Sequence, residues 1–358
     1  MTSIGDKTRI AVVLSMASNE ALLELIHATQ DLEIVGCVQG TQAGIELVRE
    51  QTPAIVLVES SSELVEFTHQ CKSISNSIGI IILGKRNDLA HYVVNALAMG
   101  AFDVIPDLDS SLTVSNLLLS KIRCCSIKQY SRMAQIGKTQ DVIATEQLKA
   151  TVQEIIPFPN RQRRISKYEA ILIGVSTGGP EALMELLPMI PESCPVPILI
   201  VLHMPKEFTV AMAETLDRKC QIRVSEATEG EIPVAGRAYL APGGRHCSLE
   251  RDSTHHLQLR LSDGPSENGC KPAVDVLFRS AAQTLSERAV ALILTGMGSD
   301  GTIGAGILKN KGAKILVQDE HSSVVWGMPG SVVRAGFADE IHPITLLANR
   351  VCELVGGT

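Results

Sequence analysis

The sequence lacks three features, each of which would have indicated a distinct class of protein. It has nine cysteines, but no C-x-x-C pair and no Cys/His cluster with zinc spacing, so neither a disulfide framework nor a metal site is expected. No apolar run approaches the ~20 residues of a membrane span, and the first residues lack a secretory-signal layout. The net charge of −7 argues against a nucleic-acid or anionic-membrane binder. We therefore expect a cytoplasmic protein with reduced thiols, no nucleic-acid partner and no membrane insertion.

The 358 residues are enough for about two domains. Residues 1–123 alternate apolar runs with amphipathic segments, which predicts a doubly wound parallel sheet. Residues 124–167 lose this periodicity, contain more basic than acidic residues and carry Pro157 and Pro159, which predicts a linker. Residues 168–358 return to alternation and predict a second α/β domain. In the first domain the predicted strands are Ile10–Leu14, Leu32–Val38, Ala54–Val58, Gly79–Leu83 and Asp103–Ile105, and the predicted helices lie around Ala21–His27, Ala43–Arg49, Leu64–Cys71, Ala90–Ala98 and Leu112–Arg123.

The second half is organised around a strand, a tight turn and a helix. The apolar run Ile171–Ile173 leads into Gly174-Val175-Ser176-Thr177-Gly178-Gly179, and Pro180 then opens a helical pattern. In this G-x-S-x-G stretch the glycines allow a sharp turn that exposes the serine hydroxyl at a helix N-terminus, where an oxyanion is favoured. Ser176 is therefore a candidate nucleophile. A phosphate-binding turn with Ser176 as helix cap is the alternative.

Two further polar residues follow buried strands of the second half. His203 comes directly after the apolar run Ile198–Leu202, and Asp300 lies in a glycine-rich turn after Ala289–Thr295. Taken singly, His203 is also compatible with a structural histidine and Asp300 with a helix cap. Taken together with Ser176 they supply a nucleophile, its base and a group to orient the base, because parallel strands bring their carboxyl ends together. Their chain order, Ser-His-Asp, differs from that of α/β-hydrolases.

The motifs of the second half resemble those of the chemotaxis receptor methylesterases, the CheB family of protein-glutamate methylesterases/glutaminases. The resemblance covers Ala170 to about Ala335, and the order receiver, linker, esterase matches as well. The motifs that carry it are Gly174–Ala182, Leu202–Pro205, Tyr239–Gly243, Asp263–Pro265, Val274–Phe278, Leu294–Gly301 and Gly327–Pro329. The resemblance implies a C-terminal three-layer α/β/α Rossmann-like methylesterase domain.

This resemblance also implies an activity, a site and partners. The protein would be a serine hydrolase that demethylates glutamate methyl esters on chemoreceptor cytoplasmic helices, releasing methanol, and that also deamidates glutamines. Ser176, His203 and Asp300 would form the triad, the backbone around Thr177 and Met297 would stabilise the oxyanion, and no metal or cofactor would be needed. Partners would be the methylated chemoreceptor cytoplasmic domain and the chemotaxis histidine kinase complex.

The first half resembles a response-regulator receiver domain, a flavodoxin-like fold, but the residues that such a domain needs for phosphorylation differ. The phosphoacceptor aspartate is replaced by Glu59, and the acidic pair after the first strand by Leu14-Ser15-Met16. Asp107 stands in place of the lysine and Gly84 in place of the hydroxyl residue. Since phosphoryl transfer needs metal and lysine to offset charge, we expect a degenerate domain that docks or regulates without phosphorylation. Glu59 is either a phosphoaspartate mimic or a solvated carboxylate.

Two other functions remain open from the sequence alone. A nucleotide-binding protein would use Gly174–Gly179 as a phosphate loop, but neither G-x-x-x-x-G-K-[ST] nor G-x-G-x-x-G is present there. A catalytically weak or inactive scaffold that docks receptors fits the degenerate receiver, whereas the three intact triad positions favour an esterase.

Overall fold

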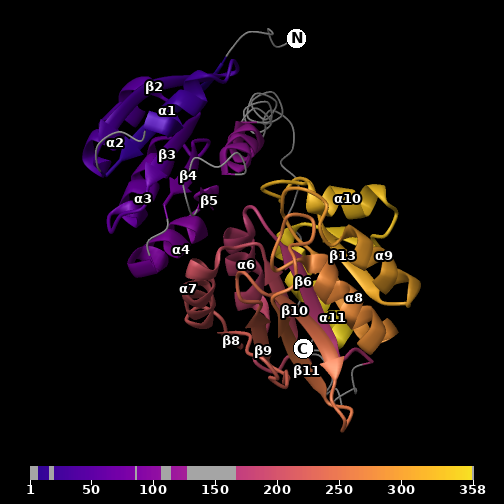
Figure 1. The fold of residues 1–358 in the computed structure, drawn as a ribbon. Coiled ribbons are helices and arrows are strands. Elements are labelled where there is room, and N and C mark those ends of the chain that lie inside the picture. Colours follow the sequence, from indigo (N-terminus) through magenta and orange to yellow (C-terminus); the bar gives the residue numbers. More distant parts are fainter. Residues whose placement is uncertain (1–6, 16–19, 85–86, 106–113, 127–166, 357–358) are drawn as a thin grey trace, which may run out of the picture.

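The computed structural model describes residues 7–15, 20–84, 87–105, 114–126 and 167–356, which form two α/β units (Figure 1). The predicted linker, 124–167, lies almost wholly outside these residues. Helical backbone spans 114–126, so the last predicted helix of the first unit runs three residues beyond Arg123. The domain limits at 123 and 168 thus stay a prediction. Within the described ranges, no helix is both long and apolar enough to span a membrane.

The first unit is a parallel sheet with strand order β2-β1-β3-β4-β5. This order is that of flavodoxin-like folds, as the receiver resemblance predicted. The central strands are buried on both faces because helices cover each side, which explains their continuous runs of Val, Ile and Leu. Its elements are β1 Thr8–Leu14, α1 Glu20–His27, β2 Leu32–Gln39, α2 Thr41–Gln51, β3 Ile55–Glu59, α3 Leu64–Ile74, β4 Gly79–Leu83, η1 Asn87–Leu89, α4 Ala90–Ala98 and β5 Asp103–Ile105.

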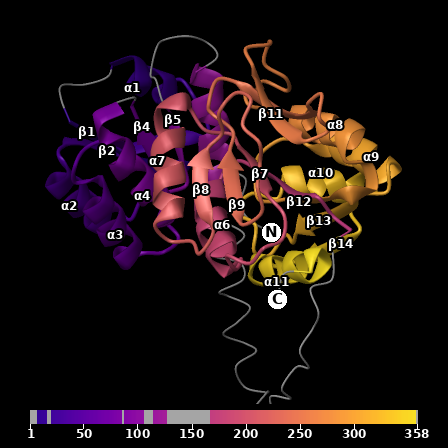
Figure 2. The same ribbon diagram turned by 90° about the horizontal axis from the view of Figure 1, so that it is seen from below.

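The second unit has a parallel sheet of order β14-β13-β12-β6-β7-β9-β8 and an antiparallel hairpin, β10-β11. Its elements are β6 Ala170–Val175, α6 Gly179–Leu186, η2 Leu187–Met189, β7 Ile198–Leu202, α7 Lys206–Asp217, β8 Arg223–Glu226, β9 Arg237–Leu240, β10 His246–Arg251, β11 Leu257–Ser262, α8 Val274–Thr284, η3 Ser286–Arg288, β12 Ala289–Ile293, α9 Thr302–Asn310, β13 Lys314–Gln318, α10 Met328–Arg334, β14 Glu340–His342 and α11 Ile344–Val355. Helices cover both faces of this sheet, which gives the three layers expected (Figure 2).

The chain direction across the second sheet reverses at β6. The strands that follow β6 first go to one side, through β7, and then return to its other side as β12 and β13. Such a switch point leaves a crevice at the carboxyl ends of the strands, where open α/β sheets bind ligands. Ser176 follows the strand at this point.

The two units pack against each other through α4, which lies on α6 and α7 (Figures 1 and 2). A continuous apolar cluster runs from the first sheet through Val93 and Val94 of α4 to Leu183 and Phe208 of the second unit. Val324 and Val325 of the second unit extend the apolar core on the other face of the first sheet. Residues of the second unit are thus buried against the apolar core on both faces of the first sheet. This burial stabilises the packing of the first unit against the second.

Candidate active site

The parallel register places the three predicted triad residues at one edge of the second sheet. β6 pairs with β7 so that Val175 lies opposite Leu202, and the His203 N–H donates to the Val175 carbonyl at 3.1 Å. On the other side β6 pairs with β12, and the Ser176 N–H donates to the Thr295 carbonyl at 3.0 Å. The structure therefore brings these strand ends together, as the sequence predicted.

The turn that carries Ser176 depends on glycine at two positions. Gly178 has φ +76°, and an added Cβ would lie 2.3 Å from the Val324 side chain. At Gly174 an added Cβ would lie 2.4 Å from Val274 at the start of α8. Both glycines are thus explained by close packing between segments of the chain, which gives them a structural reason without a phosphate ligand.

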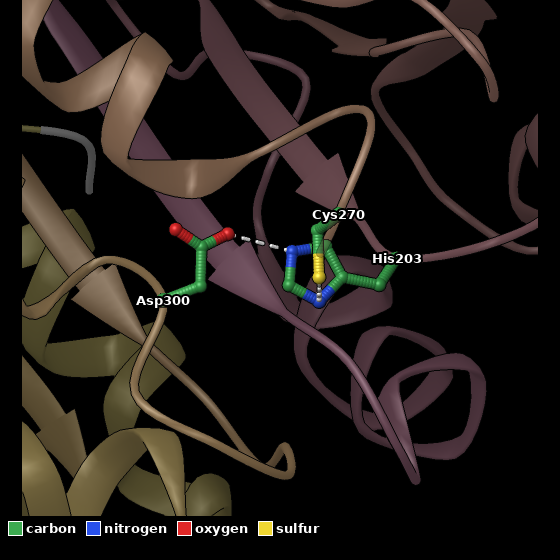
Figure 3. A group of neighbouring side chains, drawn as sticks. All are labelled: His203, Cys270 and Asp300. Carbon is green, nitrogen blue, oxygen red and sulfur yellow. Dashed lines mark hydrogen bonds and ion pairs between the residues drawn. The ribbon is translucent and has the colours of Figure 1, made fainter. Parts of the chain in front are cut away.

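His203 and Asp300 form the central contact of the site (Figure 3). Nε2 of His203 lies 2.8 Å from Oδ2 of Asp300, and the exposed fractions of the two side chains are 12% and 3%. Burial alone would lower the pKa of His203, but the hydrogen bonds and charges of Asp300 and Cys270 outweigh it and raise that pKa to about 9. Because Nε2 is engaged by Asp300, Nδ1 is the imidazole nitrogen that does not face the carboxylate.

The Asp300 carboxylate lies at the N-terminus of α8 and is held by several donors. Oδ2 accepts the Val274 N–H at 2.7 Å, and Oδ1 accepts the N–H groups of Asp275 and Gly301 at 3.1 and 2.9 Å. Burial raises the pKa of Asp300, but the hydrogen bond and charge of His203 and the N–H groups of Val274 and Asp275 outweigh it and lower that pKa. Asp300 is therefore ionised and fixed, as a group that orients an imidazolium must be.

Ser176 itself is half-buried and lies beside the loop that follows β12. A Cβ added at Gly296 would come within 2.8 Å of the Ser176 Cβ, so the loop that carries the predicted oxyanion residue Met297 packs against Ser176 at Gly296. Among the described residues no hydrogen bond joins the Ser176 hydroxyl to His203. Within the same set, the backbone N–H groups of Thr177 and Met297 donate no hydrogen bond. Loose nucleophile–base contacts are common in sites without substrate.

Two residues near the site were missed by the sequence analysis. Cys270 places its Sγ 3.5 Å from Nδ1 of His203, and Asn268 donates from Nδ2 to Asp275 at 3.0 Å and to Asp300 at 3.1 Å. Asn268 has φ +55°. Both lie between two quoted motifs, Asp263–Pro265 and Val274–Phe278, and this bracketing is the one sequence signal that could have indicated them.

Two further ionisable residues near the site, His246 and Asp275, have hydrogen bonds that give them a structural role. His246 is buried; its Nε2–H donates to the Pro265 carbonyl at 2.9 Å, and its Nδ1 accepts the Ala273 N–H at 3.2 Å. It thus supports the loop that carries Cys270. Burial raises the pKa of Asp275, although the Gly304 N–H and Asn268 both donate to its carboxyl group.

The first unit contacts both predicted oxyanion residues. Thr177 donates from Oγ1 to Oδ2 of Asp103 at 2.8 Å, and Asp103 is also paired with Lys121. The Met297 sulfur lies 3.3 Å from Ser120 Oγ and 3.3 Å from Cys124 Sγ. Side chains of the first unit therefore lie directly on the two loops that flank Ser176.

The degenerate phosphoacceptor position ends β3. Glu59 accepts the Ser15 N–H at 2.7 Å and is also bonded by the Ser15 hydroxyl. Gly84 follows β4 as expected, whereas Met16 and Asp107 lie outside the described residues. The Glu59 carboxylate is thus hydrogen-bonded to the end of β1, where a receiver domain would have acidic residues.

Comparison with known proteins gives a consistent picture. The family model described as CheB methylesterase matches residues 171–351. A protein-glutamate methylesterase/protein-glutamine glutaminase of Desulfotalea psychrophila is 34% identical over 342 residues, 93% of this chain and 94% of its own. Its counterpart in Trichodesmium erythraeum is 34% identical over 98% of this chain and 99% of its own. The crystal structure of the Thermotoga maritima CheB methylesterase catalytic domain is similar with a TM-score of 0.52 and 38% identity, over 52% of this chain and 99% of that one.

Proposed function

This chain belongs to the CheB methylesterase family. We propose that it acts as a protein-glutamate methylesterase/protein-glutamine glutaminase and that Ser176, His203 and Asp300 carry out its reaction. The observation that carries the assignment of the residues is the 2.8 Å contact between His203 and the buried Asp300, one strand away from Ser176. The substrates are a methylated glutamate, which leaves as glutamate and methanol, and a glutamine, which leaves as glutamate and ammonia. Both are acyl transfers to one nucleophile.

The mechanism follows from which nitrogen of His203 is engaged. Because Nε2 faces Asp300, Nδ1 is the nitrogen that takes the Ser176 proton as the hydroxyl attacks the ester carbonyl. Asp300 stabilises the imidazolium formed in this step. The N–H groups of Thr177 and Met297, which have no other acceptor among the described residues, are the donors for the oxyanion. His203 then returns the proton to the departing methoxide or amine, and water hydrolyses the acyl-enzyme.

The polypeptide substrate is the cytoplasmic helical region of a methylated chemoreceptor, and the site of action is the cytoplasm. The family membership supports both proposals, and the chemotaxis kinase complex would be a further partner through the first unit. The direct test is release of methanol from a receptor fragment carrying labelled methyl groups, with Ser176→Ala as control. Absence of release both from the full chain and from a chain that begins at Lys167 would contradict the proposed reaction.

The pH dependence of the reaction should follow His203. Only the neutral imidazole can accept the Ser176 proton, so kcat/KM should rise with pH through the pKa of about 9. Asp300→Asn removes the negative charge that favours the imidazolium, and should move this limb down by about 1–3 pH units. A pH–rate profile measures both. The matched control is Glu214→Gln, which removes the acidic partner of the exposed His91 and should leave the limb in place.

We also propose that the first unit regulates without being phosphorylated. With Glu59 bonded to Ser15 and no acidic pair to hold magnesium, a phosphodonor such as acetyl phosphate with Mg²⁺ should neither label the chain nor raise its activity. Glu59→Asp should stay unlabelled as well, because it restores the acceptor but not the metal site. Glu59→Gln tests the mimic, since a functioning phosphate mimic changes activity when its charge is removed. Stoichiometric labelling with a matching rise in rate would contradict the proposal.

A further inference from the structure

A buried threonine behind the nucleophile turn makes polar contacts that the proposed mechanism does not use. Thr295 comes shortly after β12 and is fully buried. Its carbonyl accepts the Ser176 N–H at 3.0 Å, and its Oγ1 donates to the Thr177 carbonyl at 2.9 Å. A single residue of the loop after β12 thus holds the chain on both sides of the peptide bond between Ser176 and Thr177.

The Thr295 hydroxyl is itself fixed in direction. It accepts the Val325 N–H at 2.9 Å, and its one proton is left for a carbonyl. The Thr177 carbonyl lies at 2.9 Å and that of Val325 at 3.3 Å, so the shorter bond is to Thr177. The Thr295 N–H donates to Oε1 of the buried Gln318 at 2.8 Å. Every polar group of Thr295 therefore has a partner inside the protein, and the side chain is held in one orientation.

The backbone of the turn shows what these contacts achieve. Thr295 bonds the Ser176 N–H and the Thr177 carbonyl, and the Ser176 carbonyl accepts the Gly179 N–H at 2.7 Å. Of the backbone groups of these two turn residues, only the Thr177 N–H lacks a hydrogen bond among the described residues. The N–H and C=O of a trans peptide point in opposite directions. The Thr177 N–H is therefore aimed away from Gly179, in a peptide that Thr295 anchors on both sides.

We propose that Thr295 is a positioning residue for the oxyanion site. Its hydroxyl keeps the Thr177 peptide from turning, so that the Thr177 N–H stays directed at the developing charge. The Met297 N–H, the second proposed donor, lies two residues further along the same loop. Donors that are fixed before the reaction stabilise an oxyanion without reorganising during it. The inference rests on the proposed function, because the oxyanion forms only when Ser176 attacks the substrate.

Thr295→Val tests this role in the full-length protein, because valine has a similar shape and lacks the hydroxyl. Loss of one buried hydrogen-bonded group is a small part of the stability of a domain, so the variant should fold. We expect kcat for methanol release to fall by about 10- to 10²-fold, less than the ~10²–10³-fold loss caused by removing a whole oxyanion donor. The same factor should appear in kcat/KM, since the contact acts in the transition state. Thr295→Ser keeps the hydroxyl and should restore most of the wild-type rate.

Two readouts separate positioning from a general loss of structure. The rise of kcat/KM with pH should stay at its wild-type place in Thr295→Val, because His203 and Asp300 keep their contact, whereas damage to the triad would move it. Thr215→Val is the matched control. Thr215 is also buried, and its hydroxyl donates to the Ala211 carbonyl at 2.7 Å, but it lies in α7 and this variant should keep near wild-type kcat.

Near wild-type kcat in Thr295→Val, or an equal loss in Thr295→Ser, would overturn the role of the hydroxyl. If Thr295→Val does not fold, Thr295→Ala takes its place, since a water in the vacated space can bond the Val325 N–H, and the same outcomes apply to it. Methanol release that persists in Ser176→Ala would instead count against the proposed function. Loss of release in Ser176→Ala together with a fully active Thr295→Val would overturn this inference alone.

Discussion

Ser176→Ala should lower methyl-ester hydrolysis by about 10⁴-fold or more, because it removes the atom that forms the acyl-enzyme. His203→Ala should have a loss of the same order, since without the imidazole the Ser176 hydroxyl is not activated. The double variant should be no slower than either single one, because residues that act as one unit do not contribute additively. Asp300→Asn should cost the same or less. Single-turnover methanol release from a methylated receptor fragment measures each effect.

The control for these variants comes from the same loop as Asp300. Ser299 is exposed and none of its side-chain atoms takes part in the contacts described above, so Ser299→Ala should keep near wild-type hydrolysis. Thermal unfolding should show that all variants stay folded at the assay temperature. Near wild-type methanol release by Ser176→Ala would show that another residue is the nucleophile, and Cys270, which shares the same imidazole nitrogen, would be the first to examine.

The sequence could predict the site to the extent that the sheet determines it. Ser176, His203 and Asp300 each follow an apolar strand, and a parallel sheet brings such ends to one edge whatever the loops do. The apolar runs Ile10–Leu14, Gly79–Leu83 and Ile198–Leu202 were found as strands at the predicted places for a related reason: continuous runs of Val, Ile and Leu need burial on two faces. The strands β8, β10, β11 and β14 of the second unit were not predicted.

Contacts made by irregular segments could not be predicted in this way. Cys270 and Asn268 lie in a loop without periodicity, and their places beside His203 and Asp300 depend on how α8 meets the loop after β12. The bond from Thr177 to Asp103 joins residues 74 positions apart in different units, so its geometry depends on the packing of α4. Such tertiary contacts have no sequence pattern of their own.

Removal of the first unit should raise the activity of the second. Asp103 holds the Thr177 side chain, and Ser120 and Cys124 contact the sulfur of Met297. The first unit thus lies on both loops whose N–H groups we propose as oxyanion donors, so we expect that a receptor helix displaces it to reach Ser176. The homologous catalytic domain of Thermotoga maritima was crystallised as a separate domain, so a chain that begins at Lys167 should fold.

For this shortened chain we expect kcat/KM for methylated receptor to rise by about tenfold or more, which corresponds to about 1.4 kcal/mol of docking free energy that substrate no longer has to overcome. Asp103→Ala in the full chain should raise it by a smaller factor, because only one contact is lost. Asp31→Ala is the matched control: it breaks an exposed pair with Arg123 within the first unit and should leave kcat/KM unchanged.

Comparison with a small soluble ester separates two possible causes of the rise in kcat/KM. Steric cover of the site slows reaction with the receptor far more than reaction with the small ester, whereas distortion of the oxyanion loops slows both reactions alike. If the shortened chain is no faster with either substrate, the first unit does not restrain the site, and the contacts at Thr177 and Met297 serve stability alone.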